Sequence, residues 1–242
     1  MSTPAPTVTS HARTQVNGIL RPSQHPVAIL VTAAITIVVL TGIGFVLTSH
    51  PIDLALSKAL NISHAGSMAR LTNVVYQLFS PIPAILITVV ATGVIWALSR
   101  QLRVAAAFAG VVAATWIPSD LIKLAVHRPR PDIHLMTHPF YPVQVDPSHP
   151  SGHTAFVTAF VVAVIFVLRG TRWLPLGAVL GAILVIVVAV SLSIDAVHYP
   201  TDVLASILWS LAVAPAARLI WADWLMPRIP LLREPAPPTL RS

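Results

Sequence analysis

The chain has 242 residues, of which 55% are hydrophobic and only 10% are charged. Soluble domains usually carry about 25% charged residues, so this composition excludes an ordinary water-soluble protein. The net charge of +7 does not indicate nucleic-acid binding, because the basic residues lie scattered between apolar segments, and the absence of cysteine excludes disulfides and thiolate metal sites.

In chain order, residues 1–26 are polar and rich in proline, which predicts a disordered tail. Six apolar segments follow, and each is expected to span a membrane as a helix of about 20 residues. The first is too long and too uniformly apolar for a cleaved signal, so we expect it to be a signal-anchor. The fourth has only fifteen residues. The segments are residues 27–49, 81–99, 104–122, 154–168, 174–194 and 203–222.

The predicted fold class is therefore all-α, an integral membrane bundle of six transmembrane helices formed by residues 27–226. The Pro-rich residues 227–242 are expected to form a second disordered tail. No internal repeat is evident.

The placement of basic residues predicts the orientation of the bundle, because loops on the cytoplasmic side carry an excess of Lys and Arg. With both termini in the cytoplasm, ten of the fifteen basic residues lie inside: Arg13, Arg21, Arg100, Arg103, Arg169, Arg172, Arg218, Arg228, Arg233 and Arg241. The outside set is Lys58, Arg70, Lys123, Arg128 and Arg130. We therefore expect a multi-pass cell-membrane protein with both termini cytoplasmic, and its longest polar loop, between the third and fourth spans, extracytoplasmic.

Three short stretches at that outer surface carry titratable groups. The first, KLAVHRPRP at residues 123–131, is by itself typical of a basic patch against lipid headgroups, but it lies on the side that the positive-inside rule disfavours. The second, HPSGHT at residues 149–154, predicts a helix start with Ser151 as N-cap. The free N–H groups there suit an anion, and Gly152 allows close approach of a ligand, although a plain capped helix fits equally well.

The third stretch, VHYPTD at residues 197–202, begins the sixth span. Pro200 suits a first helical turn, which places His198 just ahead of the helix and Asp202 inside that turn. At this separation a carboxylate can reach an imidazole nitrogen and orient the ring. The alternative is an acidic residue favoured by the helix dipole beside an interfacial histidine.

Together the three stretches supply a nucleophile, a second imidazole, a helix N-terminus and cations, which are the parts that phosphoryl transfer needs. In order and spacing they resemble the type 2 phosphatidic acid phosphatase superfamily of membrane lipid phosphatases, whose motifs are K-x6-R-P, P-S-G-H and S-R-x5-H-x3-D. The matching residues here are Lys123, Arg130, Pro131, Pro150, Ser151, Gly152, His153, Ser191, His198 and Asp202.

The resemblance implies a role for each matching residue. His198 would attack phosphorus and form a phosphohistidine, Asp202 would orient it, and His153 would protonate the leaving oxygen and then activate water. Lys123, Arg130, Ser151 and Gly152 would hold the phosphate oxygens. No cofactor and no metal is implied, and the spacing of the other external histidines matches no zinc pattern.

The third motif departs from the family because Leu192 follows Ser191 where the family has Arg, and residues 173–217 contain no arginine. Losing one transition-state donor costs roughly 100- to 1,000-fold in rate. Three explanations remain open: Arg128 replaces the missing cation, the substrate needs fewer cations, or the protein binds lipid phosphates without cleaving them.

The expected activity is metal-independent removal of the terminal phosphate from a lipid phosphate or polyprenyl diphosphate at the outer leaflet. The expected partner is a membrane lipid, not nucleic acid. A phosphotransferase using the same histidine, a silent binder, and a transporter with Asp120 as its membrane charge are the alternatives. Asp195 stays unexplained; it could point away from the site or bind a substrate hydroxyl. The sequence leaves the oligomeric state open.

Overall fold

In the computed structural model of the chain, residues 17–233 are described, and helices dominate them. Each of the six predicted apolar segments forms a helix: α1 Pro26–Ser49, α4 Pro81–Ser99, α5 Leu102–Val126, α6 Gly152–Leu168, α7 Leu174–Ile194 and α8 Pro200–Arg218. Five of them are long and apolar enough to cross a membrane, if α8 is counted together with its continuation to Arg228. Helix α6 is a shorter apolar helix. The predicted all-α membrane bundle is confirmed.

The short helix α6 lies inside the bundle, where it packs against α5, α7 and α8. Most of its side chains are buried, including Phe156 and Ala163, whereas only 17% of the most apolar window of α1 and 6% of that of α4 are enclosed by protein. Helices α1 and α4 therefore present apolar side chains outward, as lipid-facing helices do.

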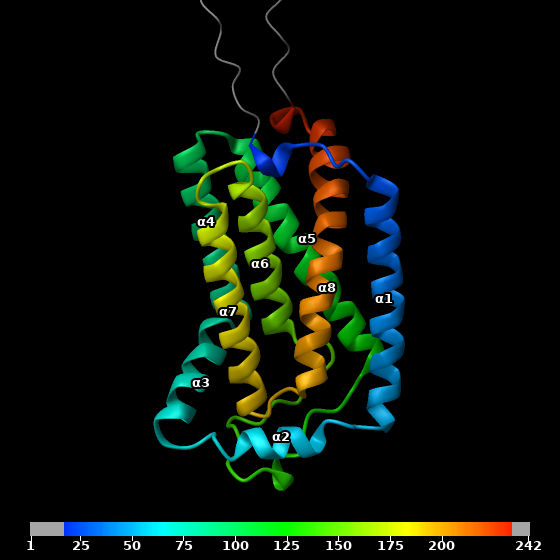
Figure 1. The fold of residues 1–242 in the computed structure, drawn as a ribbon, viewed down its shortest axis with the longest axis vertical. Coiled ribbons are helices and arrows are strands. Elements are labelled where there is room, and N and C mark those ends of the chain that lie inside the picture. Colours follow the sequence, from blue (N-terminus) through cyan, green and yellow to red (C-terminus); the bar gives the residue numbers. More distant parts are fainter. Residues whose placement is uncertain (1–16, 234–242) are drawn as a thin grey trace, which may run out of the picture.

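Two helices were not predicted. Helices α2 (Leu54–Asn61) and α3 (Gly66–Leu78) follow α1; α2 lies across one end of the bundle, at the bottom of Figure 1, and α3 rises obliquely beside that end. Both are short, and polar residues alternate with apolar ones along them, so neither has the continuous apolar run that marks a span. Asn61 ties this layer to the bundle, because its side-chain amide donates to the carbonyl oxygens of His138 and Ile194.

The loop between α5 and α6 and the turn between α7 and α8 lie at the same end as α2 and α3 (Figure 1). The three stretches singled out in the sequence therefore converge on one end of the molecule. The start of α1 and the end of α8 lie at the opposite end.

Part of each predicted tail packs on the bundle at that opposite end. Ile19, in the short 3-10 helix η1 (Gly18–Leu20), is fully buried, and Leu232, in the 3-10 helix η5 (Pro230–Leu232), is 8% exposed. The rest of the two predicted tails, residues 1–16 and 234–242, falls outside the described residues.

Helix α8 continues as a π-helix, η3 (Leu219–Leu225), followed by the 3-10 helix η4 (Met226–Arg228). Two contacts fix this continuation. Asp223 accepts a hydrogen bond from Nη2 of Arg218, five residues earlier, at 2.8 Å, and the indole N–H of Trp221 donates to the carbonyl of Ala106 in α5 at 2.8 Å.

Candidate active site

The start of α8 positions the first candidate residue. Pro200 is the first residue of the helix, and Oδ2 of Asp202 accepts a hydrogen bond from the backbone N–H of Tyr199 at 3.0 Å. This capping contact satisfies a donor that the helix leaves free. It fixes His198 just ahead of the helix, as the sequence predicted.

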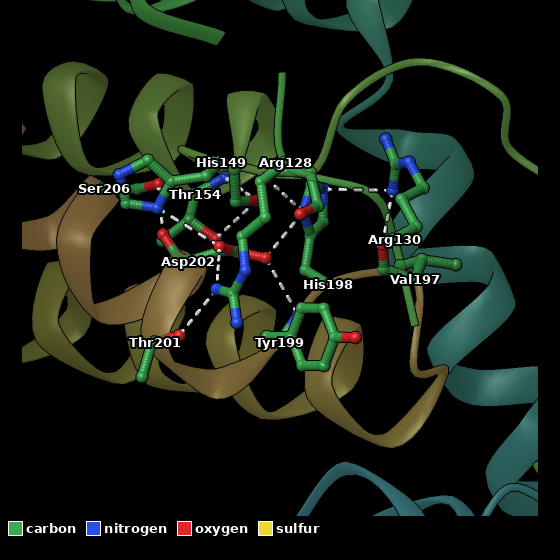
Figure 2. Close-up of polar contacts among 12 residues, drawn as sticks. Arg128, Arg130, His149, Thr154, Val197, His198, Tyr199, Thr201, Asp202 and Ser206 are labelled. Atoms are coloured by element: carbon green, nitrogen blue, oxygen red, sulfur yellow. Dashed lines mark hydrogen bonds and ion pairs between the residues drawn. The ribbon is translucent and has the colours of Figure 1, made fainter. Parts of the chain in front are cut away.

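The ring of His198 is fully buried, and its surroundings determine its tautomer. Nδ1 lies 2.8 Å from the carbonyl oxygen of Ser148, which can only accept, so Nδ1 carries the proton and donates. Nε2 is then unprotonated, and it lies 3.4 Å from Nη1 of Arg130 (Figure 2). Burial lowers the pKa of His198 well below its usual range, and the charges of Arg130 and Lys123 lower it further, so the ring is neutral at physiological pH.

Asp202 was expected to orient His198, but the two side chains do not form a hydrogen bond, because Oδ2 lies 4.0 Å from Nδ1. Its Oδ1 instead accepts from Nη1 of Arg128 at 2.6 Å and lies 3.2 Å from Nδ1 of His149 (Figure 2). The Ser148 carbonyl occupies the orienting position. Asp202 caps α8 and anchors two side chains of the loop between α5 and α6.

Arg128 was considered as a replacement phosphate ligand, and its position does not fit that role. Its guanidinium is 1% exposed and pairs with both Asp202 and Asp53, the latter at 3.0 Å. It also donates to Oγ1 of Thr201 and stacks over the ring of Tyr199, 4.0 Å from the ring centroid. A buried cation with two carboxylates and an aromatic face around it joins the loops together and is not exposed to a phosphate ligand.

The start of α6 positions the second imidazole. Ser151 is the N-cap, and its Oγ accepts from the backbone N–H of Thr154 at 3.4 Å, as the sequence predicted. The ring centroid of His153 lies 6.5 Å from that of His198 and 4.4 Å from that of Tyr76 in α3. Among the described residues, Nε2 of His153 has no hydrogen-bond partner. It is therefore available to exchange a proton with a ligand.

A cavity of about 360 Å³, the candidate cavity hereafter, lies in front of His153. Gly152 lines it, and a Cβ added there would meet only Oδ1 of Asp120, at 3.6 Å, and the indole nitrogen of Trp116, at 4.0 Å. Neither contact is closer than ordinary van der Waals distance, so packing within the protein does not require glycine at this position. Close approach of a ligand remains a physical reason for it.

Within the described part of the chain, two cations line the candidate cavity: Lys123, from α5, and Arg130, from the loop after it. Both are held by Asp146. Nζ of Lys123 pairs with Oδ2, while Nη2 of Arg130 donates to Oδ1 and Nε to the backbone carbonyl, each at 2.9 Å. Burial alone would raise the pKa of Asp146, but the hydrogen bond from Lys123 and the charge of Arg130 lower it on balance, so the carboxylate is ionised. A carboxylate thus bridges the two cations expected to bind phosphate.

Leu192 is fully buried within the apolar core, in the last turn of α7. This position therefore carries no charge, whereas the third motif of the phosphatase superfamily has Arg there. Asp195 follows directly after this helix, and it lines a cavity of about 310 Å³ that Arg130 also lines. It is 1% exposed, and Oδ1 lies 3.4 Å from Nε2 of His64.

Several residues of the site were not predicted. The contact from Ser148 is made by its backbone carbonyl, so the identity of its side chain gives no indication of it. Tyr76 lies in α3, a helix that the sequence did not predict. Asp146 could have been suspected, because it is an acidic residue in the loop that joins the two cations to His153. Among residues 17–233, no three His, Cys, Asp or Glu side chains lie close enough to hold a metal ion.

The geometry groups an unprotonated imidazole nitrogen, a second imidazole, two cations and a helix N-terminus around one end of the bundle. A neutral imidazole can attack an electrophilic centre, cations stabilise an anionic transition state, and a second imidazole can transfer a proton to the leaving group. Phosphoryl transfer is the reaction class that uses all of these parts.

Comparison with known families and structures agrees with this arrangement. The sequence model of the PAP2 superfamily matches residues 102–225, a range that contains every candidate residue from Lys123 to Asp202. No curated protein matches the chain. Among solved structures, it is similar to one described as the crystal structure of the first transmembrane PAP2 type phosphatidylglycerolphosphate phosphatase from Bacillus subtilis.

The likeness to that structure has a TM-score of 0.63 at 17% sequence identity, and it covers 86% of this chain and 98% of the other. At this identity the likeness concerns the fold. The family match spans half of the chain, and on that basis the chain belongs to the PAP2 superfamily.

Proposed function

We propose that this PAP2 superfamily member removes the terminal phosphate from a lipid phosphate, with a phosphohistidine on His198 as intermediate. The observation that carries the proposal is the state of the His198 ring. The Ser148 carbonyl holds the proton on Nδ1, and Nε2 is left unprotonated beside Arg130. A buried imidazole fixed in this tautomer is prepared to act as a nucleophile.

The first step forms a bond between Nε2 of His198 and phosphorus while the bond from phosphorus to the leaving oxygen breaks. His153 enters this step as the imidazolium, gives that oxygen its proton and becomes neutral. In the second step His153 takes a proton from water, whose oxygen attacks phosphorus and releases His198 and inorganic phosphate. Lys123, Arg130 and the N–H groups at the start of α6 neutralise the phosphate oxygens.

Asp202 serves this reaction indirectly. It ties the start of α8 to Arg128 and His149, and both belong to the loop that also carries the Ser148 carbonyl. Its role is to keep that carbonyl in line with Nδ1 of His198, so it is a positioning residue.

The lining of the candidate cavity supports an amphiphilic substrate. Beside the cations it contains Phe79, Pro81, Trp116 and Leu124, which come from the α3–α4 junction and from α5. An apolar wall beside two cations suits a lipid whose phosphate lies next to those cations. A polyprenyl diphosphate is our first choice, and a phosphatidate or phosphatidylglycerol phosphate is the second; the similar solved structure is described as a phosphatase for the last of these.

The distribution of basic residues supports a site at the outer leaflet, with both termini cytoplasmic. Metal independence is also part of the proposal, because the imidazole and the cations supply the nucleophile and the charge stabilisation.

A catalytically silent lipid-phosphate binder is a second candidate, and two observations favour it. Leu192 leaves the site without the family's third cation, and Asp146 neutralises the two that remain. A phosphotransferase would share the first step and use an acceptor other than water.

The test is phosphate release by the detergent-purified protein, with polyprenyl diphosphate and phosphatidate assayed side by side. His198→Ala should abolish release from both, while His134→Ala, which changes an exposed histidine at the same end, should retain it. Binding of both lipids without release would favour the silent binder. Release that depends on an added alcohol would favour the transferase.

A further inference from the structure

A second cavity, of about 510 Å³, lies at the end of the bundle opposite the candidate active site. Residues 17–25 cross that end, where Figure 1 shows them in dark blue at the top. They enclose the cavity together with the start of α1, the end of α6 and the end of α8. We call it the distal cavity; its lining includes Arg21, Arg169, Arg218, Ile29, Phe166 and Pro215.

Arg218 forms the inner wall of the distal cavity. It is 3% exposed, and its Nη1 donates to the carbonyl oxygens of Ile19 and Arg21 at 2.9 and 2.7 Å. Its Nη2 donates to Ser23 Oγ and pairs with Asp223. This buried cation holds the 17–25 segment in place and so builds the cavity.

The distal cavity has a basic lining, in which Arg218 is neutralised by its ion pair with Asp223 while Arg21 and Arg169 are exposed. Its described lining includes three arginines and His25 but no acidic residue. Arg169 stacks on the ring of Phe166, 4.5 Å from its centroid, and its pKa is lowered by burial and by the charge of Arg218. An anion beside Arg21 and Arg169 would be attracted to both guanidinium groups.

The start of α1 adds to the positive potential of the distal cavity. His25 is the N-cap of α1, its side chain makes no capping hydrogen bond, and Pro26 follows at the first helical position. The positive end of the helix dipole therefore faces the same region as the arginines.

A separate apolar groove lies close to the distal cavity, between α1 and α8. Ile29 and Pro215 line the cavity, and the groove begins about one turn further along the same two helices. It measures about 410 Å³, and its lining comes only from α1 and α8: Thr32, Ile35, Thr36, Val39, Leu40, Leu208, Leu211 and Ala212. Several of these side chains are exposed, including Ile35 at 58% and Leu211 at 52%. A cationic cavity about one helical turn from an apolar groove has the two-part chemistry of a phospholipid.

We propose that the distal cavity binds the headgroup of an anionic phospholipid, with one acyl chain in the groove between α1 and α8. Basic pockets between transmembrane helices are suited to anionic headgroups, since each cation near the surface adds attraction. This site is separate from the candidate active site and binds a lipid that is not turned over. The occupant is a phosphodiester lipid of the membrane leaflet opposite the candidate active site.

The test measures lipids bound to the detergent-purified full chain by native mass spectrometry. Phosphatidylserine and phosphatidylcholine with the same acyl chains are titrated separately, and inorganic phosphate is a third arm. Phosphatidylserine should bind at least tenfold more tightly than phosphatidylcholine, and inorganic phosphate should not compete with it at equal concentration.

Three variants locate the binding. Arg21→Gln combined with Arg169→Gln should weaken phosphatidylserine binding roughly tenfold or more. Ala212→Trp fills the groove without changing charge and should weaken binding of both lipids, which keeps the proposal testable if the double variant folds poorly. Arg100→Gln removes an exposed cation at the same end but outside the cavity and should bind as the unaltered chain does.

An equal loss in Arg100→Gln would overturn the proposal in favour of diffuse surface charge. Unchanged binding in both cavity variants would also overturn it. Competition by inorganic phosphate at equal concentration would show that a free anion, not a lipid, occupies the cavity.

Discussion

The Ser148 carbonyl, at 2.8 Å, orients His198, while the nearest oxygen of Asp202 lies at 4.0 Å from the same ring nitrogen. A carbonyl fixes the tautomer as a carboxylate would, but it adds no full negative charge to stabilise an imidazolium. The ring therefore stays neutral among the cations around it. In the proposed reaction this keeps the nucleophile active below pH 6.5, the ordinary pKa of histidine.

At the residue scale, Asp146 is the first residue to change. Its carboxylate bridges Lys123 and Arg130 and so competes with a phosphate for both cations. In Asp146→Asn we expect inorganic phosphate to inhibit about tenfold more strongly, because the competing charge is gone while the side chain keeps its shape. The inhibition constant for phosphate, measured at constant ionic strength, checks this.

Asp132→Asn is the matched control, because Asp132 is an acidic residue of the same loop whose Oδ1 accepts from the backbone N–H of His134, with no ion pair to either cation. Weaker inhibition by phosphate in Asp146→Asn than in the control would contradict the prediction. Asp146 would then position the two cations instead of competing for them.

Asp195 predicts a pH-dependent stability. Burial raises its pKa from 3.8 to about 6, outweighing the opposing effects of Thr72 and His64. Because the folded state holds this proton more tightly than the unfolded state, stability falls as pH rises from about 4 to 6, by about 3 kcal/mol in total. Asp195→Asn should therefore raise the Tm at pH 8 by several degrees and much less at pH 4.5. An equal gain at both pH values would contradict this origin of the effect.

At the scale of elements, the packing of η3 on α5 depends on one glycine. A Cβ added at Gly110 would lie 2.0 Å from the indole nitrogen of Trp221, which is fixed by its hydrogen bond to Ala106. Gly110→Ala should therefore destabilise the protein by about 1–3 kcal/mol and lower its Tm. Gly93→Ala in α4 is the control, since a Cβ there meets nothing within 4 Å and alanine favours the helix. Equal Tm values for the two variants would refute the packing argument.

The sequence predicted the elements that are long and continuously apolar, and it did not predict those that depend on tertiary contacts. All six apolar segments became helices, including the short α6, which is enclosed by α5, α7 and α8. Helices α2 and α3 were missed because their mixed composition has no membrane-length apolar run. The caps at Ser151 and Pro200 were predicted because capping is a local property of the chain.

At the scale of the whole molecule, the two ends of the bundle differ in chemistry, with the candidate active site at one and the distal cavity at the other. Motif spacing predicted that Lys123, Arg130, His153 and His198 gather at one end. It could not predict which partner each residue takes, because Arg128 meets Asp53 and Asp202 only through contacts distant in sequence. Residue identities are readable from a motif, whereas hydrogen-bond partners depend on the folded loops.

The orientation of these ends can be tested directly because the chain has no cysteine. A single cysteine at Val145, which is 96% exposed beside the candidate site, should react with a membrane-impermeant maleimide in intact cells. One at Arg172, an exposed residue at the opposite end, should react only after permeabilisation. The reverse pattern would place the candidate site in the cytoplasm and contradict the predicted topology.

The most direct test of the central claim is to trap the phosphorylated enzyme. The purified protein is mixed with a labelled polyprenyl diphosphate, quenched in alkali, where phosphohistidine survives, and mapped by mass spectrometry. The account predicts label on Nε2 of His198, appearing within one turnover and absent from His198→Ala. Phosphate release without any label on His198, or label that persists in His198→Ala, would contradict it.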